Sequence, residues 1–128
     1  MYEVMVEGNF SAAHNLRGYR KKCEKLHGHN WKVRVGIRGG KLDKYGMLID
    51  FRDVKDYLEK IIKKLDHKYL NEISHFKVTN PTSENIARFI YNDLKFRLQG
   101  SQYGVSKVTV WESDTTSATY LQDRKDVE

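Results

Sequence analysis

Cysteine, proline and long apolar runs are scarce in this 128-residue sequence. Its single cysteine excludes an intramolecular disulfide, which favours a reducing compartment, and we expect the cytoplasm. No apolar stretch approaches the roughly 20 residues of a membrane-spanning helix, and the first ten residues lack the apolar core of a secretory signal. With one proline and no repeat or Pro/Ser-rich tract, nothing marks a boundary, so one domain is expected over residues 1–128.

Apolar residues make up 39% of the chain, which is low for a free-standing globule and favours burial through oligomerisation. The formal net charge is +6. Such an excess suits an anionic partner, which could be a nucleic acid, a membrane surface or a phosphorylated small molecule. The alternative is a solvated, lysine-rich surface with no partner at all.

Two stretches alternate in polarity with the period of a β-strand. In residues 2–14, one parity carries Tyr2, Val4, Val6, Phe10, Ala12 and His14. In residues 27–37, one parity carries His27, His29, Trp31, Val33, Val35 and Ile37. We predict two half-buried strands that pair antiparallel across the basic loop 15–26.

Helical spacing follows in two places. Asp50 is a predicted N-cap for an apolar stripe of Phe51, Val54, Leu58, Ile61, Ile62 and Leu65. A second helix is expected to start near 80–82, with Pro81 in its first turn and Ile86, Phe89, Ile90, Leu94 and Leu98 as its stripe. Alternation returns at 105–112, and short strands are expected near 47–49 and 118–121.

This order predicts an α+β fold, in which a four-stranded antiparallel sheet carries two helices on one face. The opposite sheet face would present Lys32, Arg34 and Arg38. It is polar enough to meet solvent or to line a wide oligomeric barrel.

Three of the five histidines form a candidate metal site. His27 and His29 flank Gly28, so their rings project to the same side of a strand. His14 shares the apolar parity of the first predicted strand and would reach the same end of the sheet. Three imidazoles suit zinc and leave one coordination position open. The alternative is that these are unrelated packing histidines.

Cys23 lies in a charged loop with Lys21, Lys22 and Lys25 nearby. A lone cysteine is usually a small buried hydrophobe. The neighbouring cations favour the thiolate, which makes Cys23 a candidate base or nucleophile as well.

The motif Cys23-x-x-x-His27-Gly28-His29 resembles the signature of the 6-pyruvoyl-tetrahydropterin synthase family. Segments 10–14, 46–51, 65–71 and 80–85 resemble further landmarks of that family, in the same order, and Glu112 completes the set. Together they span nearly the whole chain. The nearest resemblance is to the 6-carboxytetrahydropterin synthase branch, which serves queuosine and related deazapurine synthesis.

The resemblance implies the tunnelling fold, a strand-strand-helix-helix-strand-strand unit. It implies a homo-oligomer in which trimers close a barrel and two barrels stack into a hexamer, with pockets at subunit contacts. It also implies a zinc-dependent lyase acting on 7,8-dihydroneopterin triphosphate. The product would be 6-carboxy-5,6,7,8-tetrahydropterin, with loss of triphosphate and acetaldehyde, and neither nucleic acid nor membrane would be a partner.

Individual roles follow from the same resemblance. It implies zinc ligation by His14, His27 and His29, proton acceptance by Cys23, an acid–base relay by Asp66 and His67, a grip on the pterin by Glu112, and contacts to the ring from Thr82 and Ser83. A carboxylate such as Glu112 can accept two N–H bonds from an aminopyrimidine edge. Thr82 and Ser83 could instead cap a helix.

Glu24 leaves the exact product open. It follows Cys23 directly, and a related branch with Glu-x-x-His-Gly-His makes 6-hydroxymethyl-dihydropterin for folate. Glu24 could therefore bind the substrate or act as a general base, or it could be only a surface charge. A 6-pyruvoyl product also stays possible. The candidates for holding the triphosphate are the basic residues Arg17, Arg20, Lys21, Lys22 and Lys25.

Two other classes of function compete with a pterin synthase. One is a zinc-stabilised module that binds RNA without catalysis, although no known RNA-binding signature is present. The other is a zinc hydrolase that uses metal-bound water, which would leave Cys23 without a role.

Overall fold

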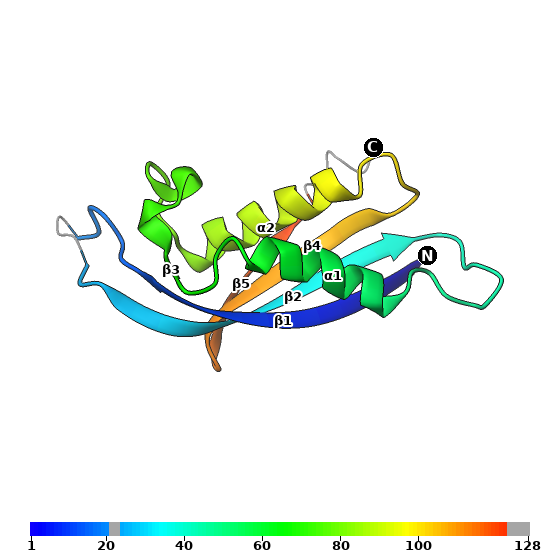
Figure 1. The fold of residues 1–128 in the computed structure, drawn as a ribbon, viewed down its shortest axis with the longest axis horizontal. Coiled ribbons are helices and arrows are strands. Elements are labelled where there is room, and N and C mark those ends of the chain that lie inside the picture. Colours follow the sequence, from blue (N-terminus) through cyan, green and yellow to red (C-terminus); the bar gives the residue numbers. More distant parts are fainter. Residues whose placement is uncertain (21–23, 123–128) are drawn as a thin grey trace.

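The structure, a computed structural model, describes residues 1–20 and 24–122. Its elements follow in the order β1 (Tyr2–His14), β2 (His27–Gly39), α1 (Phe51–Ile62), β3 (Lys68–Tyr69), the 3₁₀ turns η1 (Leu70–Glu72) and η2 (Ser74–Phe76), α2 (Ser83–Arg97), β4 (Gly104–Ser113) and β5 (Thr116–Leu121). The five strands form one sheet in the order β3-β1-β2-β4-β5 (Figure 1).

The long hairpin of β1 and β2 sets the register of the sheet. Its strands pair antiparallel from Tyr2 opposite Gly39 to His14 opposite His27, as the alternation predicted. Because side chains alternate between faces, this register sends the apolar parity of both strands to the same side. The two histidines at the end of the hairpin therefore face each other.

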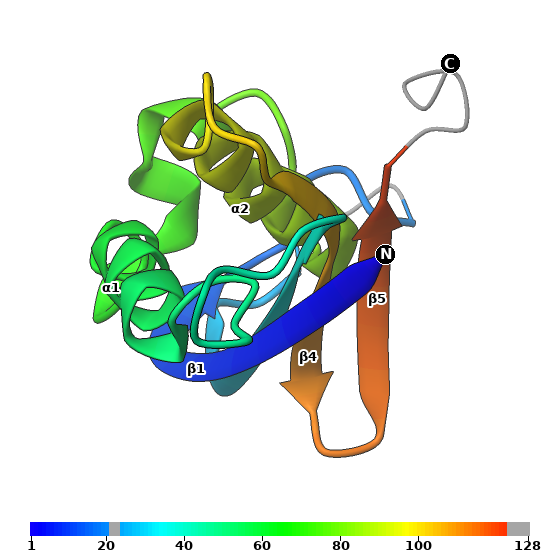
Figure 2. The ribbon, with the colours of Figure 1, turned by 90° about the vertical axis from the view of Figure 1, so that its right-hand side faces the viewer.

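β4 continues the sheet beyond β2 and turns back into β5 (Figure 2). The strand expected near 118–121 is thus confirmed as part of β5. The sheet face opposite the helices is polar, as expected. On it, Lys32 and Arg34 lie over the Trp111 ring, with 4.4 and 5.0 Å to its centroid, and Arg34 pairs with Glu7.

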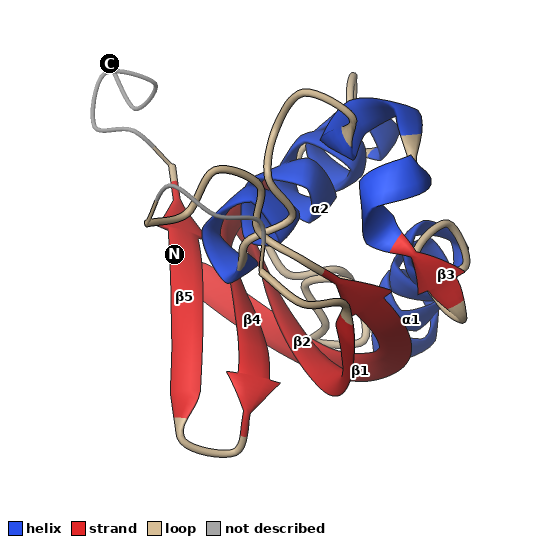
Figure 3. Cartoon of the chain, turned by 90° about the vertical axis from the view of Figure 1, so that its left-hand side faces the viewer, coloured by secondary structure: helices blue, strands red, loops and turns tan. Residues whose placement is uncertain are grey.

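Both helices cover the other face (Figure 3). α1 packs on β1, while α2 packs on β4 and β5. Asp50 caps α1, as predicted, by accepting a hydrogen bond from the Arg52 N–H. The largest fully buried side chains include Trp31, Phe76, Ile37, Leu58, Ile61, Leu65, Ile86, Ile90 and Leu94. No helix in the described part of the chain is long and apolar enough to cross a membrane.

The predicted four-stranded antiparallel sheet is wrong in one respect, because the sheet has five strands and is mixed. After α1 the chain returns along the free edge of β1, where Lys68 and Tyr69 pair in parallel with Ala12 and Ala13. A two-residue strand is too short to show a period in the sequence. Its pairing depends on where α1 ends relative to β1.

Two smaller expectations for the region before α1 are also corrected. Residues 47–49 form no strand, and Leu48 and Ile49 are instead buried against the end of the sheet. Phe51, expected in the apolar stripe of α1, is 61% exposed. Leu48 and Ile49 therefore add to the core from the loop before α1. The buried face of α1 itself starts one turn later, with Val54.

Gly8 allows α1 to approach β1 closely. It lies on the core-facing parity of β1, and a Cβ there would be 2.8 Å from Ile62 Cδ1 and 3.1 Å from Leu58 Cδ2. We expect Gly8→Val to lower the free energy of unfolding by about 1–3 kcal/mol, as overpacked cores do. Urea denaturation measures this change. Gly40→Val is the matched control, because no atom lies within 4 Å of its Cβ position, and an equal effect at Gly40 would contradict the argument.

Candidate metal centre and active site

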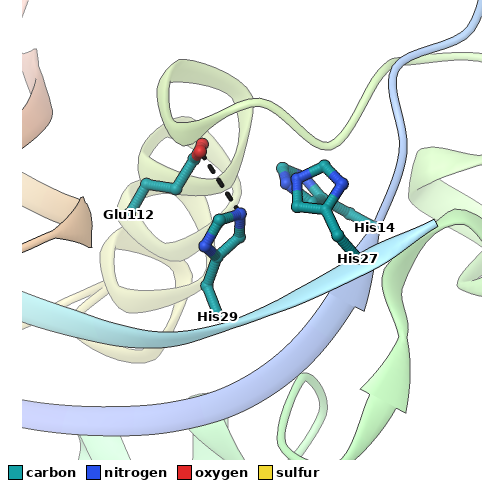
Figure 4. Close-up of side chains that lie close together, drawn as sticks. All are labelled: His14, His27, His29 and Glu112. Atoms are coloured by element: carbon teal, nitrogen blue, oxygen red, sulfur yellow. Dashed lines mark ion pairs between the residues drawn. The ribbon is translucent and has the colours of Figure 1, made fainter. Parts of the chain in front are cut away.

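Three histidine rings meet at the end of the β1–β2 hairpin (Figure 4). The ring centroids of His14 and His27 are 4.7 Å apart, those of His27 and His29 are 4.7 Å apart, and those of His14 and His29 are 5.2 Å apart. His14 lies opposite His27 in the register, and His29 is two residues further along the same face of β2. The structure therefore brings together the three histidines that strand parity had singled out.

Backbone carbonyls orient two of these rings. His14 Nδ1 lies 2.7 Å from the Pro81 carbonyl oxygen, and His27 Nδ1 lies 2.8 Å from the Lys25 carbonyl oxygen. A carbonyl oxygen can only accept, so each Nδ1 carries the hydrogen, and in the neutral ring Nε2 is then the nitrogen with the lone pair. Metal-binding histidines are typically oriented by such a second hydrogen bond. No pattern around Pro81 predicted that its carbonyl would supply one of them.

Buried nitrogens without hydrogen-bond partners point into this group. Within the described residues, His14 Nε2 and His29 Nε2 are buried and make no hydrogen bond. Burial lowers the pKa of His29, which favours the neutral imidazole that a metal requires. The nearby Glu112 carboxylate acts in the opposite direction on the same pKa.

Glu112 joins the histidines from the end of β4. Its Oε1 lies 3.3 Å from His29 Nε2, an ion-pair distance whose geometry makes no hydrogen bond. One ligand atom from each of the three histidines and Glu112 lies within 4.8 Å of the others. Three imidazole nitrogens and one carboxylate oxygen are a donor set that fits zinc. The sequence analysis had named Glu112 through the family resemblance alone and had not placed it beside the histidines.

Glu24 lies beside the same group and is not a freely solvated surface charge. Its Oε1 accepts a hydrogen bond from the Leu16 N–H at 3.3 Å and lies 3.7 Å from His27 Nδ1. Its own N–H donates to the Leu16 carbonyl at 2.9 Å. The predicted base Cys23 lies outside the described residues, as do Lys21 and Lys22.

The predicted relay pair lies at the outer edge of β1. His67 Nδ1 is 3.0 Å from Asp66 Oδ1, and that oxygen also accepts the Ser11 N–H at 2.9 Å. The hydrogen bond from Ser11 and the contact with His67 lower the pKa of Asp66. His67 has a φ of 57° and is 81% exposed. Within residues 1–20 and 24–122, no hydrogen bond, ion pair or ring contact joins this pair to the three histidines.

Thr82 caps α2, since its hydroxyl accepts the Asn85 N–H at 3.1 Å. The helix begins at Ser83, which is buried, so Pro81 precedes the cap and is not in the first turn. Both residues follow Pro81, whose carbonyl orients His14, and their contact with the pterin ring stays a prediction.

The basic residues predicted to hold a triphosphate differ in their contacts and exposure. The Arg17 guanidinium donates to the Phe76 carbonyl and, at 3.3 Å, to the Thr79 carbonyl, so it is committed to the backbone. Arg20 is exposed and lies over the Tyr19 ring, and Lys25 is also exposed. Arg17 therefore has a structural role, and binding of the triphosphate by any of these residues stays a prediction.

The chain is similar to known proteins over nearly its whole length. The family model for 6-pyruvoyl tetrahydropterin synthase matches residues 3–123. A 6-carboxy-5,6,7,8-tetrahydropterin synthase of Synechocystis sp. is 35% identical, over 97% of this chain and 96% of that protein. A dihydroneopterin monophosphate aldolase of Pyrococcus furiosus is 32% identical, over 87% and 90%.

The fold is shared as well. The structure of Caenorhabditis elegans 6-pyruvoyl tetrahydropterin synthase superposes with a TM-score of 0.80 at 28% identity, covering 96% of this chain and 98% of that one. Family model, relatives and fold agree, and this chain belongs to the 6-pyruvoyl tetrahydropterin synthase family.

Proposed function

We propose that this protein is a zinc-dependent lyase that converts 7,8-dihydroneopterin triphosphate to 6-carboxy-5,6,7,8-tetrahydropterin, with loss of triphosphate and acetaldehyde. In this proposal it serves queuosine synthesis in the cytoplasm. The observation that carries the proposal is the convergence of His14, His27 and His29 with Glu112, in a family member with relatives that bear this synthase's name.

In the proposed site, His14, His27 and His29 hold the metal through their Nε2 atoms. Zinc bound there would act as a Lewis acid that stabilises negative charge on an oxygen of the substrate side chain. Glu112 has two tasks open to it. It can close the metal site in the free protein, and it can accept the two N–H groups of the pterin edge once substrate is bound.

Proton transfer is assigned to residues around this centre. Cys23 would accept the proton from the substrate side chain, with Glu24 as a second acceptor beside it. Asp66 Oδ1 lies 3.0 Å from His67 Nδ1, so His67 Nε2 would be the nitrogen that exchanges protons with substrate. Thr82 and Ser83 would border the ring.

The exposed Asp66–His67 pair supports a pocket that is shared between subunits, because this pair makes no described contact with the histidines of its own chain. We therefore expect a trimer or a hexamer built from two trimers. Multi-angle light scattering of the zinc-loaded protein measures the assembly. A monodisperse monomer with full activity would contradict the shared pocket.

A second candidate is cleavage of a dihydroneopterin side chain to give 6-hydroxymethyl-dihydropterin. Two observations favour it: the similarity to the Pyrococcus furiosus aldolase, and the position of Glu24 beside His27. In that reaction Glu24 would be the main base. The substrate could then carry one phosphate instead of three.

One experiment separates these functions. Zinc-loaded protein is incubated in parallel with the triphosphate and the monophosphate of 7,8-dihydroneopterin, and products are identified by mass spectrometry. We expect 6-carboxy-5,6,7,8-tetrahydropterin and acetaldehyde from the triphosphate. Hydroxymethyl or pyruvoyl pterin as the main product would assign one of the alternatives, and no turnover of either substrate would overturn both candidates in favour of a binding module.

A further inference from the structure

The short segment that follows His14 is unusual in how its backbone is held. Residues 15–17 lie outside any strand, yet each of their three N–H groups and three carbonyls has a hydrogen-bond partner. Loop backbone is normally satisfied in part by solvent. Here the partners are mostly side chains from distant parts of the chain.

Two asparagine amides supply four of these six hydrogen bonds. Asn71 Oδ1 accepts the Asn15 N–H at 3.0 Å, and Asn71 Nδ2 donates to the Asn15 carbonyl at 2.9 Å. Asn80 repeats the pattern on Arg17, accepting its N–H at 3.0 Å and donating to its carbonyl at 3.1 Å. Each amide thus pairs with the backbone as one residue of a neighbouring strand would, and Asn71 is only 7% exposed.

Leu16 lies between Asn15 and Arg17. Its backbone N–H and carbonyl point away from the two asparagine amides and pair with Glu24. The two residues exchange N–H donors, at 3.3 Å to Glu24 Oε1 and 2.9 Å to the Leu16 carbonyl. Asn15 adds a third link by donating from Nδ2 to the Glu24 carbonyl at 3.1 Å, and the Tyr69 hydroxyl fixes that amide by donating to Asn15 Oδ1 at 2.8 Å. The asparagines therefore hold one side of the segment while Glu24 is held on the other.

We propose that Asn71 and Asn80 are positioning residues, which clamp residues 15–17 and thereby hold Glu24 beside His27 at the candidate metal centre. Asn80 also precedes Pro81, whose carbonyl orients His14, so the same clamp ties a metal ligand to the loop. The consequence for catalysis rests on the proposed pterin chemistry, whereas the hydrogen bonds of the clamp are independent of that proposal.

The test uses Asn71→Asp and Asn80→Asp in the full-length, zinc-loaded protein. Aspartate has the same shape, but it replaces the donor Nδ2 with an oxygen that faces a backbone carbonyl. Asn92→Asp is the matched control, with the same change in charge on an exposed position of α2. Amide hydrogen exchange at Asn15, Arg17 and Glu24 is the first readout.

We expect exchange at these amides to accelerate about tenfold in both clamp variants, as the loss of a hydrogen bond of roughly 1.4 kcal/mol would give. Strand β2 should keep its protection. The second readout is the formation of 6-hydroxymethyl-dihydropterin, the product assigned to Glu24, per bound zinc. The kcat for this product should fall by about 10- to 100-fold, with little change in KM and with zinc content retained. A variant that only destabilised the fold would lose zinc-loaded protein and keep its kcat per zinc.

The outcomes are distinguishable. Unchanged exchange at Asn15 and Arg17 in the variants overturns the clamp, whatever the turnover. Accelerated exchange with wild-type kcat overturns the positioning role. If the wild-type protein turns over no pterin, the proposed function fails alone, and the exchange result decides whether the clamp holds Glu24.

Discussion

Replacing His29 with alanine is expected to remove zinc and activity together. His29 supplies a buried Nε2 that makes no hydrogen bond within the described structure, and it faces the rings of His14 and His27. Its loss leaves His14, His27 and the Glu112 carboxylate, so the three-imidazole set assigned to zinc is broken. The rings of His14 and His27 are each held by strand pairing and by a backbone carbonyl at Nδ1, so we expect neither to move to compensate. Metal analysis should find about one zinc per chain in the wild type and roughly a tenth or less in His29→Ala.

The fold should survive this change, because the His29 side chain is only half-buried and the core of the hairpin lies further along β1 and β2. Circular dichroism and light scattering check that point. His75→Ala is the matched control, since His75 packs on Phe76 and Phe89, away from the centre, and should keep its zinc. Full zinc content in His29→Ala would refute the metal assignment.

The second large effect concerns the adjacent candidates Cys23 and Glu24. A thiolate among cations is a good base near neutral pH, whereas a carboxylate must be desolvated to match it. We expect Cys23→Ala to lower the rate of the main reaction by roughly two or more powers of ten. Zinc should stay in place, and any residual product should shift toward 6-hydroxymethyl-dihydropterin.

The substitution at Glu24 must keep a hydrogen-bond acceptor, because this side chain also accepts the Leu16 N–H. Glu24→Gln keeps an acceptor oxygen for that hydrogen bond and removes only the carboxylate charge. It should eliminate the minor hydroxymethyl product and spare the carboxy product, as measured by mass spectrometry. If instead Cys23→Ala keeps the carboxy product and Glu24→Gln abolishes it, Glu24 is the base and the folate-type reaction is the better assignment.

The sequence alone determined which residues face the helices and that three histidines share one end of the sheet. Strand side chains repeat with a period of two, so parity within 2–14 and 27–37 settles which face each residue occupies once the strands pair. The helix stripes and the cap at Asp50 follow from equally local rules. For these features the chemistry of neighbouring residues is sufficient.

Only the tertiary structure decided what surrounds those histidines. The Pro81 carbonyl on His14, Glu112 beside His29, the parallel strand β3 and the clamp by Asn71 and Asn80 all join segments far apart in the chain. None of them repeats with a period, and each involves one or two residues. Their positions depend on where the helices end and the loops return, which is set by packing of the whole core and not by local sequence.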